Sequence, residues 1–118
     1  MENHELLDEA AGLIHMGGDQ KLYRQILQIF FEDAPGQIKK IQTGIESHDV
    51  NQIERESHGL KGAAANVGAE SIRKAALEVE LAAKAGDFEK IRTRFEQLEN
   101  EWTRFKAFLK NLPQKIQG

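Results

Sequence analysis

The stretch FEKIRTRFEQLENEWTRFKAFLKNL, at residues 88–112, decides the fold class. Its large apolar residues recur at alternating spacings of three and four positions. This spacing places them on one face of a helix with 3.6 residues per turn. We therefore predict a long amphipathic helix that buries one stripe against other helices. The stripe consists of Phe88, Ile91, Phe95, Leu98, Trp102, Phe105, Leu109 and Leu112.

Helical spacing also dominates the first half of the chain, where turn residues divide it into segments. A short helix is predicted over residues 5–15, ending at Gly17 and Gly18. Asp19 is a good N-cap for a second helix. The segment EDAPG at 32–36 should break or kink this helix around Pro35, and a third segment follows it. The predicted stripes of these two segments are Leu22, Ile26, Ile29 and Phe30, then Ile38, Ile41 and Ile45.

Two further helices are predicted before residue 88. The first covers about residues 50–66 and begins at a capping-box-like pair, Asp49 and Gln52. The second ends at Gly86, and Asp87 caps the final helix. Their stripes are Val50, Ile53, Ser57, Leu60, Ala64 and Val67, then Ile72, Ala76, Val79 and Ala83.

The predicted architecture is all-α, because no segment has strand-like alternation. Short turns between amphipathic helices favour antiparallel neighbours. Four long segments, each with one apolar stripe, should close into an antiparallel up-down bundle, with the short N-terminal helix covering one end. We expect residues 1–118 to form a single domain. A monomer is expected, since the four stripes can bury one another within one chain.

The composition excludes several classes of function. The net charge is −3 and cysteine is absent, so neither a basic nucleic-acid footprint nor a disulfide framework is indicated. The apolar runs are too short to span a bilayer. The acidic N-terminus, MENHELLDEAAG, lacks the basic and apolar regions of a secretory signal. A cytoplasmic location is therefore expected.

The segment ESHGLKGAAANVG, at residues 56–68, carries the candidate chemistry. Its two helix-interior glycines, Gly59 and Gly62, together cost roughly 2 kcal/mol relative to alanine. His58 lies about 120° from the centre of the apolar stripe at 100° per residue, so it should be at least partly in solvent. Glu54, Lys61, Gly62 and Ala65 are its helical neighbours.

A neutral imidazole is a good nucleophile near neutral pH. Gly62 leaves room for a tetrahedral group on the ring, and Lys61 is a mobile positive charge within reach of that group. Phosphoryl transfer needs mainly positioning and charge stabilisation, so these residues could supply half of such a reaction. In a plainer reading, His58 is a silent surface residue and Gly62 only allows close helix packing.

No other motif indicates chemistry. His4, His15 and His48 form no metal-ligand spacing with one another. The segment MGGD at 16–19 lacks the Gly-Lys-Ser/Thr of a phosphate-binding loop. Neither a metal nor a cofactor is expected, and the chain should not phosphorylate itself from ATP.

The segment from His58 to Ala64 resembles the motif of the histidine-containing phosphotransfer (HPt) family. That motif is a histidine, any residue, an apolar residue, lysine, glycine and then small residues. The similarity extends to NVGA at 66–69, GGDQKLYRQILQIFFEDAP at 17–35 and VELAAKAGD at 79–87. It covers about the whole chain. Gly59 and Val79 depart from the usual pattern, but neither departure removes a chemical group.

The resemblance implies a four-helix bundle with an exposed phospho-accepting histidine at His58. It implies that Lys61 lies near the phosphoryl group and that Gly62 keeps the site open; Ala65, a small helical neighbour of His58, is expected to help shape the site. An acidic or amide residue on the adjacent helix often faces the histidine in this family, and the alignment places Glu80 there.

Two functions from different classes remain open. In the first, the chain is a phosphorelay shuttle of two-component signalling, a carrier that is more a reactant than an enzyme. It takes phosphate from the aspartyl phosphate of one receiver domain, in a response regulator or hybrid histidine kinase, and passes it to another. Any magnesium would sit in the receiver. In the second, the chain is a helical interaction module that binds receivers without being phosphorylated. The sequence does not distinguish a free-standing protein from a module of a sensor kinase.

Overall fold

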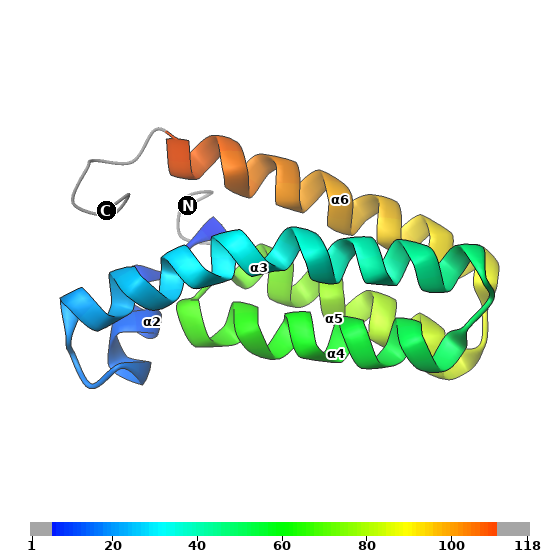
Figure 1. Ribbon diagram of the computed structural model, residues 1–118, viewed down its shortest axis with the longest axis horizontal. Coiled ribbons are helices and arrows are strands. Elements are labelled where there is room, and N and C mark those ends of the chain that lie inside the picture. Colours follow the sequence, from blue (N-terminus) through cyan, green and yellow to red (C-terminus); the bar gives the residue numbers. More distant parts are fainter. Residues whose placement is uncertain (1–5, 111–118) are drawn as a thin grey trace.

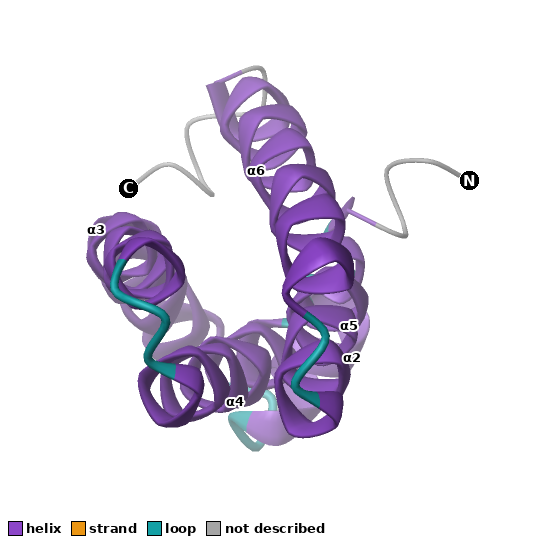
Figure 2. Ribbon diagram, turned by 90° about the vertical axis from the view of Figure 1, so that its right-hand side faces the viewer, coloured by secondary structure: helices purple, strands orange, loops and turns teal. Residues whose placement is uncertain are grey.

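The computed structural model describes residues 6–110, which fold into helices without any strand. The helices, labelled as in Figure 1, are α2 (Glu9–His15), α3 (Gln20–Glu46), α4 (Val50–Val67), α5 (Glu70–Ala85) and α6 (Phe88–Lys110). α3 to α6 are long and follow one another around a bundle, joined by short turns (Figure 2). Successive members run antiparallel, and α2 packs at one end (Figure 1). The predicted all-α up-down bundle with an extra N-terminal helix is confirmed.

Side-chain caps define most of the helix starts, as the sequence predicts. Asp19 accepts a hydrogen bond from the Leu22 backbone N–H at 3.0 Å, and Asp87 accepts one from Lys90 at 3.1 Å. Asp49 caps α4 through Gln52 N–H at 3.0 Å. The Gln52 side chain, however, donates to the Lys40 carbonyl at 2.8 Å. It therefore ties α4 to α3 instead of completing a capping box.

Of the predicted break or kink at EDAPG, the break is wrong, because α3 runs through Pro35 as one helix of 27 residues. Proline in a helix interior costs about 3 kcal/mol. Pro35 itself is exposed, while Phe30, Ala34 and Ile38 are buried on the same side of α3. Continuing the helix keeps these apolar side chains in one core, and their burial offsets the cost.

The core face of α3 also differs from the predicted stripe. Leu22 and Ile29 are exposed, whereas Tyr23 and Leu27 are buried. Apolar residues are so frequent in this segment that two stripes fit the helical period. The Tyr23 hydroxyl selects one of them, because it donates to the Val67 carbonyl at 2.8 Å and ties α3 to the end of α4.

The first described helix is shorter than predicted. α2 begins at Glu9 because the Asp8 side chain accepts from the Ala11 N–H at 3.0 Å and caps it there. The Asp8 N–H donates to the Gly68 carbonyl at 2.7 Å, which joins this segment to the turn between α4 and α5. Residue 5 of the predicted helix and Leu112 of the predicted final stripe lie outside the described residues.

Two seams of the bundle are built differently. Between α3 and α6 lies an aromatic cluster, defined as Phe30, Phe31, Trp102 and Phe105. Its ring centroids are 5.6–6.1 Å apart in four pairs. α4 and α5 contain no Phe, Trp or Tyr. Their buried side chains are mostly small or aliphatic, and α5 also buries the carboxylate of Glu80.

Candidate functional site

His58 lies on the part of α4 that borders α5, and its side chain is 67% exposed. The ring is nevertheless held, because Nδ1 lies 2.9 Å from Oε2 of Glu80 on α5. A carboxylate accepts hydrogen bonds and donates none. The contact therefore favours the tautomer with the proton on Nδ1. Nε2 then carries the free lone pair.

Glu80 is the buried charged group of the site. Its residue is only 3% exposed, so the carboxylate needs positive partners. The Lys61 ammonium lies 2.8 Å from Oε1, a buried oxygen that accepts no other hydrogen bond. The Lys84 ammonium lies 3.6 Å from Oε2, the oxygen that also faces His58. The Glu80 carboxylate thus contacts one histidine and two lysines.

These partners decide the charge of Glu80. Burial raises the pKa of the Glu80 carboxyl, but the hydrogen-bonding contacts with Lys61 and His58 and the positive charge of Lys61 outweigh burial. The pKa therefore lies below its usual range, and Glu80 is ionised near neutral pH. His58 consequently faces a fixed negative charge on its Nδ1 side.

The two glycines beside His58 differ in their surroundings. A Cβ at Gly62 would have no heavy atom within 4 Å, so the surface there is open. A Cβ at Gly59 would lie 3.2 Å from Nε2 of Gln37, so Gly59 permits close approach of α3. Ala65, one turn beyond Lys61, is half-buried and adds no polar group.

A shallow depression of about 490 Å³ surrounds the ring of His58. Sequence reasoning missed Lys84 as part of it. The spacing of Glu80 and Lys84 by four residues was the available signal, since such pairs meet on a helix surface. The depression is lined by Asn51, Glu54, Arg55, His58, Glu80 and Lys84.

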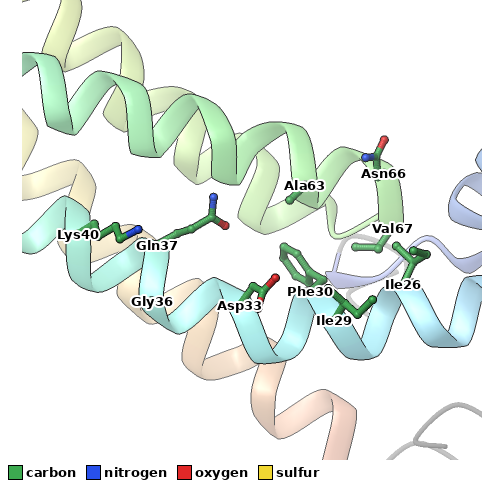
Figure 3. Close-up of a pocket in the computed structure, with 10 residues that line it drawn as sticks. All are labelled: Ile26, Ile29, Phe30, Asp33, Gly36, Gln37, Lys40, Ala63, Asn66 and Val67. Carbon is green, nitrogen blue, oxygen red and sulfur yellow. The ribbon is translucent and has the colours of Figure 1, made fainter.

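A second depression, of about 460 Å³, lies between α3 and α4 (Figure 3). Ile26, Ile29 and Phe30 form its apolar floor on α3, and Ala63 with Val67 lies opposite on α4. Its polar lining residues are Asp33, Gln37, Lys40 and Asn66. Gln37 also contacts the position of Gly59, next to His58, so this groove adjoins the exposed face of α4.

Other kinds of site were also sought in residues 6–110. No cluster of three or more His, Cys, Asp or Glu side chains there could hold a metal ion. Within the same range, no helix is both long and apolar enough to cross a membrane.

Comparison with known proteins assigns the sequence to a family. The sequence profile described as "Hpt domain" matches residues 25–108. No curated protein matches the chain.

Several solved structures share the fold. Histidine-containing phosphotransfer protein B from Pseudomonas aeruginosa is 21% identical, with a TM-score of 0.82 and 95% of each chain covered. The maize histidine-containing phosphotransfer protein ZmHP2 is 19% identical, with a TM-score of 0.81, over 96% of this chain and 86% of its own. The HPT domain of a sensor hybrid histidine kinase from Shewanella is 21% identical, with a TM-score of 0.70, over 92% of this chain and 97% of its own.

Proposed function

The chain belongs to the Hpt domain family, and on that premise we propose that His58 is the residue that carries the phosphoryl group in a phosphorelay. The family acts in two-component signalling, together with histidine kinases and receiver domains. The observation that carries the assignment to His58 is its pairing with Glu80 at 2.9 Å. That pairing occupies Nδ1 and leaves Nε2 free on an exposed ring.

The transfer step follows from this arrangement. The Nε2 lone pair attacks the phosphorus of an aspartyl phosphate in the receiver. The bond between phosphorus and the carboxylate oxygen breaks, and the carboxylate leaves with the electron pair. The ring keeps its Nδ1 proton and becomes a phosphorylated imidazolium. Its positive charge faces ionised Glu80, so no proton has to move. Attack on Nε2-bound phosphorus by a second receiver's carboxylate reverses these changes.

The other predicted site residues support the step in different ways. Lys61 balances the charge of Glu80 and holds its carboxylate between α4 and α5. Gly62 leaves space for the receiver's phosphorylated aspartate to approach, since a Cβ there would meet nothing within 4 Å. Ala65 keeps the next turn of the same face small.

A receiver domain that reaches His58 must cover the exposed face of α4. The groove between α3 and α4 offers the receiver an apolar surface on the α3 side of α4, whereas His58 lies on the side that borders α5. Magnesium belongs to the receiver in this scheme. The monomeric state, the cytoplasmic location and the lack of ATP-dependent kinase activity remain predictions.

The direct test is to mix the chain with a receiver that carries labelled aspartyl phosphate, with magnesium present. Label should pass to the chain and should be lost in acid but kept in base, as expected of phosphohistidine. His58→Gln should take no label while its circular dichroism stays unchanged, because the ring is exposed. His15→Gln, which changes an exposed histidine on α2, is the matched control and should be labelled normally.

Two results would contradict the proposal. Label retained on His58→Gln would place the phosphate elsewhere. If several receivers bind the chain in a titration but leave the wild type unlabelled, the chain is an interaction module instead of a shuttle.

A further inference from the structure

We infer that Lys84 is the cation that contacts the phosphoryl group on His58. This inference rests on the proposed function of His58. Neither the helical neighbours of His58 on α4 nor the motif around it points to Lys84, which lies on α5.

Lys84 is placed beside the reacting ring. Its Nζ lies 3.6 Å from Oε2 of Glu80, and the same oxygen lies 2.9 Å from Nδ1 of His58. Lys84 and Glu80 line the depression around His58, whereas Lys61 does not. A phosphoryl group on Nε2 is attached to the same ring, so the flexible lysine side chain can reach its oxygens by rotating about its stem.

The two lysines are held differently. Lys61 is 26% exposed and lies 2.8 Å from Oε1, which is buried and has no other partner. Turning Lys61 toward a phosphoryl group would leave that oxygen unpaired, which is costly. Lys84 is 53% exposed, and its contact is longer. Oε2 keeps its partner His58 when Lys84 moves, so Lys84 is the lysine that can be released.

The charges around the depression call for such a cation. Glu54 and Glu80 both line it and repel an incoming phosphoryl group. Arg55 also lines it, but its Nε lies 3.5 Å from Glu56, outside the lining. Lys61 balances Glu80 from the buried side. Lys84 therefore supplies the positive charge on the side from which the phosphoryl group arrives.

The experiment loads the full chain with phosphoramidate, a donor that needs no receiver. The P–N bond of the donor breaks, ammonia leaves, and phosphorus becomes bonded to Nε2 of His58. The pKa of the bound phosphoryl group is then measured by ³¹P NMR for wild type, Lys84→Gln, Lys61→Gln and Lys74→Gln. Lys74 is an exposed lysine on the same helix and serves as the matched control.

A nearby cation favours the dianion and lowers the phosphoryl pKa. Lys84→Gln should therefore raise it by about half a unit, the size expected of a half-exposed ion pair. Lys61→Gln should raise it less, and Lys74→Gln should leave it unchanged. A purely structural role of Lys84 would not move this value.

Two results would overturn the inference. An unchanged phosphoryl pKa in Lys84→Gln would remove Lys84 from the site, and an equal or larger shift in Lys61→Gln would assign the contact to Lys61. In both cases the phosphate is still on His58, so the proposed function stands. Failure of the wild type to load, or loading of His58→Gln, would instead refute the proposed function and this inference with it.

Discussion

The seam between α4 and α5 and the seam between α3 and α6 hold the same bundle together with different side chains. The α3–α6 seam carries the aromatic cluster, whose four rings pack in edge-on, tilted and stacked pairs. The α4–α5 seam has no large ring, but it carries a buried carboxylate with cationic partners from both helices. Large apolar area thus lies on one side of the bundle, and polar chemistry lies on the other.

The difference indicates a division of labour within a small domain. Aromatic residues bury 150–250 Å² each and dominate core energetics. A buried ion pair contributes little net stability because desolvation opposes it. We therefore expect changes in the aromatic cluster to alter stability without altering phosphoryl transfer. Changes around Glu80 should alter phosphoryl transfer and cost less stability than the loss of a buried ring.

The largest expected effect is on stability, from Trp102→Ala. Removal of this buried ring should lower the free energy of unfolding by about 3–5 kcal/mol. The folded fraction should still accept phosphate at the wild-type rate. Urea denaturation followed by circular dichroism measures the loss. Thr103→Ala, at the next and exposed position, should change stability by less than about 0.5 kcal/mol. Lost transfer in folded Trp102→Ala would break the comparison.

The second effect is on rate, from Glu80→Gln. The amide can still accept the Nδ1 proton's hydrogen bond, but it carries no charge to stabilise the imidazolium. Transfer from a phosphorylated receiver should slow roughly tenfold, or about 1.4 kcal/mol in activation free energy. Glu78→Gln is the matched control, because Glu78 pairs with Arg94 of α6 and is remote from His58. Equal rates in the two variants would show that the charge of Glu80 is not used.

The third effect concerns Gly62, where a larger side chain should raise stability or slow transfer from a receiver, depending on its size. Gly62→Ala should stabilise the chain by about 0.5–1 kcal/mol, because the position is helical and unobstructed. The larger Gly62→Gln should slow transfer from a receiver but not labelling by phosphoramidate. Gly86→Ala should destabilise instead, since Gly86 adopts a φ of 68°. A destabilised Gly62→Ala would mean that this glycine serves packing.

The smallest effect is a pH dependence that distinguishes the two seams. The pKa of Glu80 is lowered in the folded chain, so the unfolded chain binds more protons as the pH falls. The stability that Glu80 contributes is present above its ordinary pKa of 4.5 and is lost as the pH falls through the lower folded value. Wild type should therefore lose more stability than Glu80→Gln between about pH 5 and about pH 3, the interval around the ordinary pKa of a carboxyl group. Equal losses would contradict a charged Glu80.

The sequence allowed much of the fold to be predicted, because strong local signals agree with the packing. The stripe of α6 and the caps Asp19, Asp49 and Asp87 needed only helical periodicity and side-chain chemistry. The break at Pro35 was a wrong prediction, because the cost of proline is local while its compensation comes from a core shared by distant helices. The face of α3 depended on Tyr23, whose partner lies 44 residues away.

In the candidate site, the residues on α4 could be predicted from the sequence more readily than those on α5. The motif singles out His58, Lys61 and Gly62 because they lie within five residues on one helix. The orientation of Glu80 toward His58 depends on how α4 and α5 are aligned across their turn, which periodicity does not determine. Lys84 could not be assigned before that alignment was known, although its spacing from Glu80 was visible.

The residues that line the depression around His58 all belong to one helical hairpin, α4 and α5, and the His58–Glu80 pair spans only 22 positions. Contacts so close in sequence form early and at small entropic cost when a chain folds. The residues around His58 could therefore be transferred to another protein as one helical hairpin. An engineer who redesigns α3 or α6, or grafts this hairpin onto another pair of supporting helices, carries every lining group along and has only to rebuild an apolar backing.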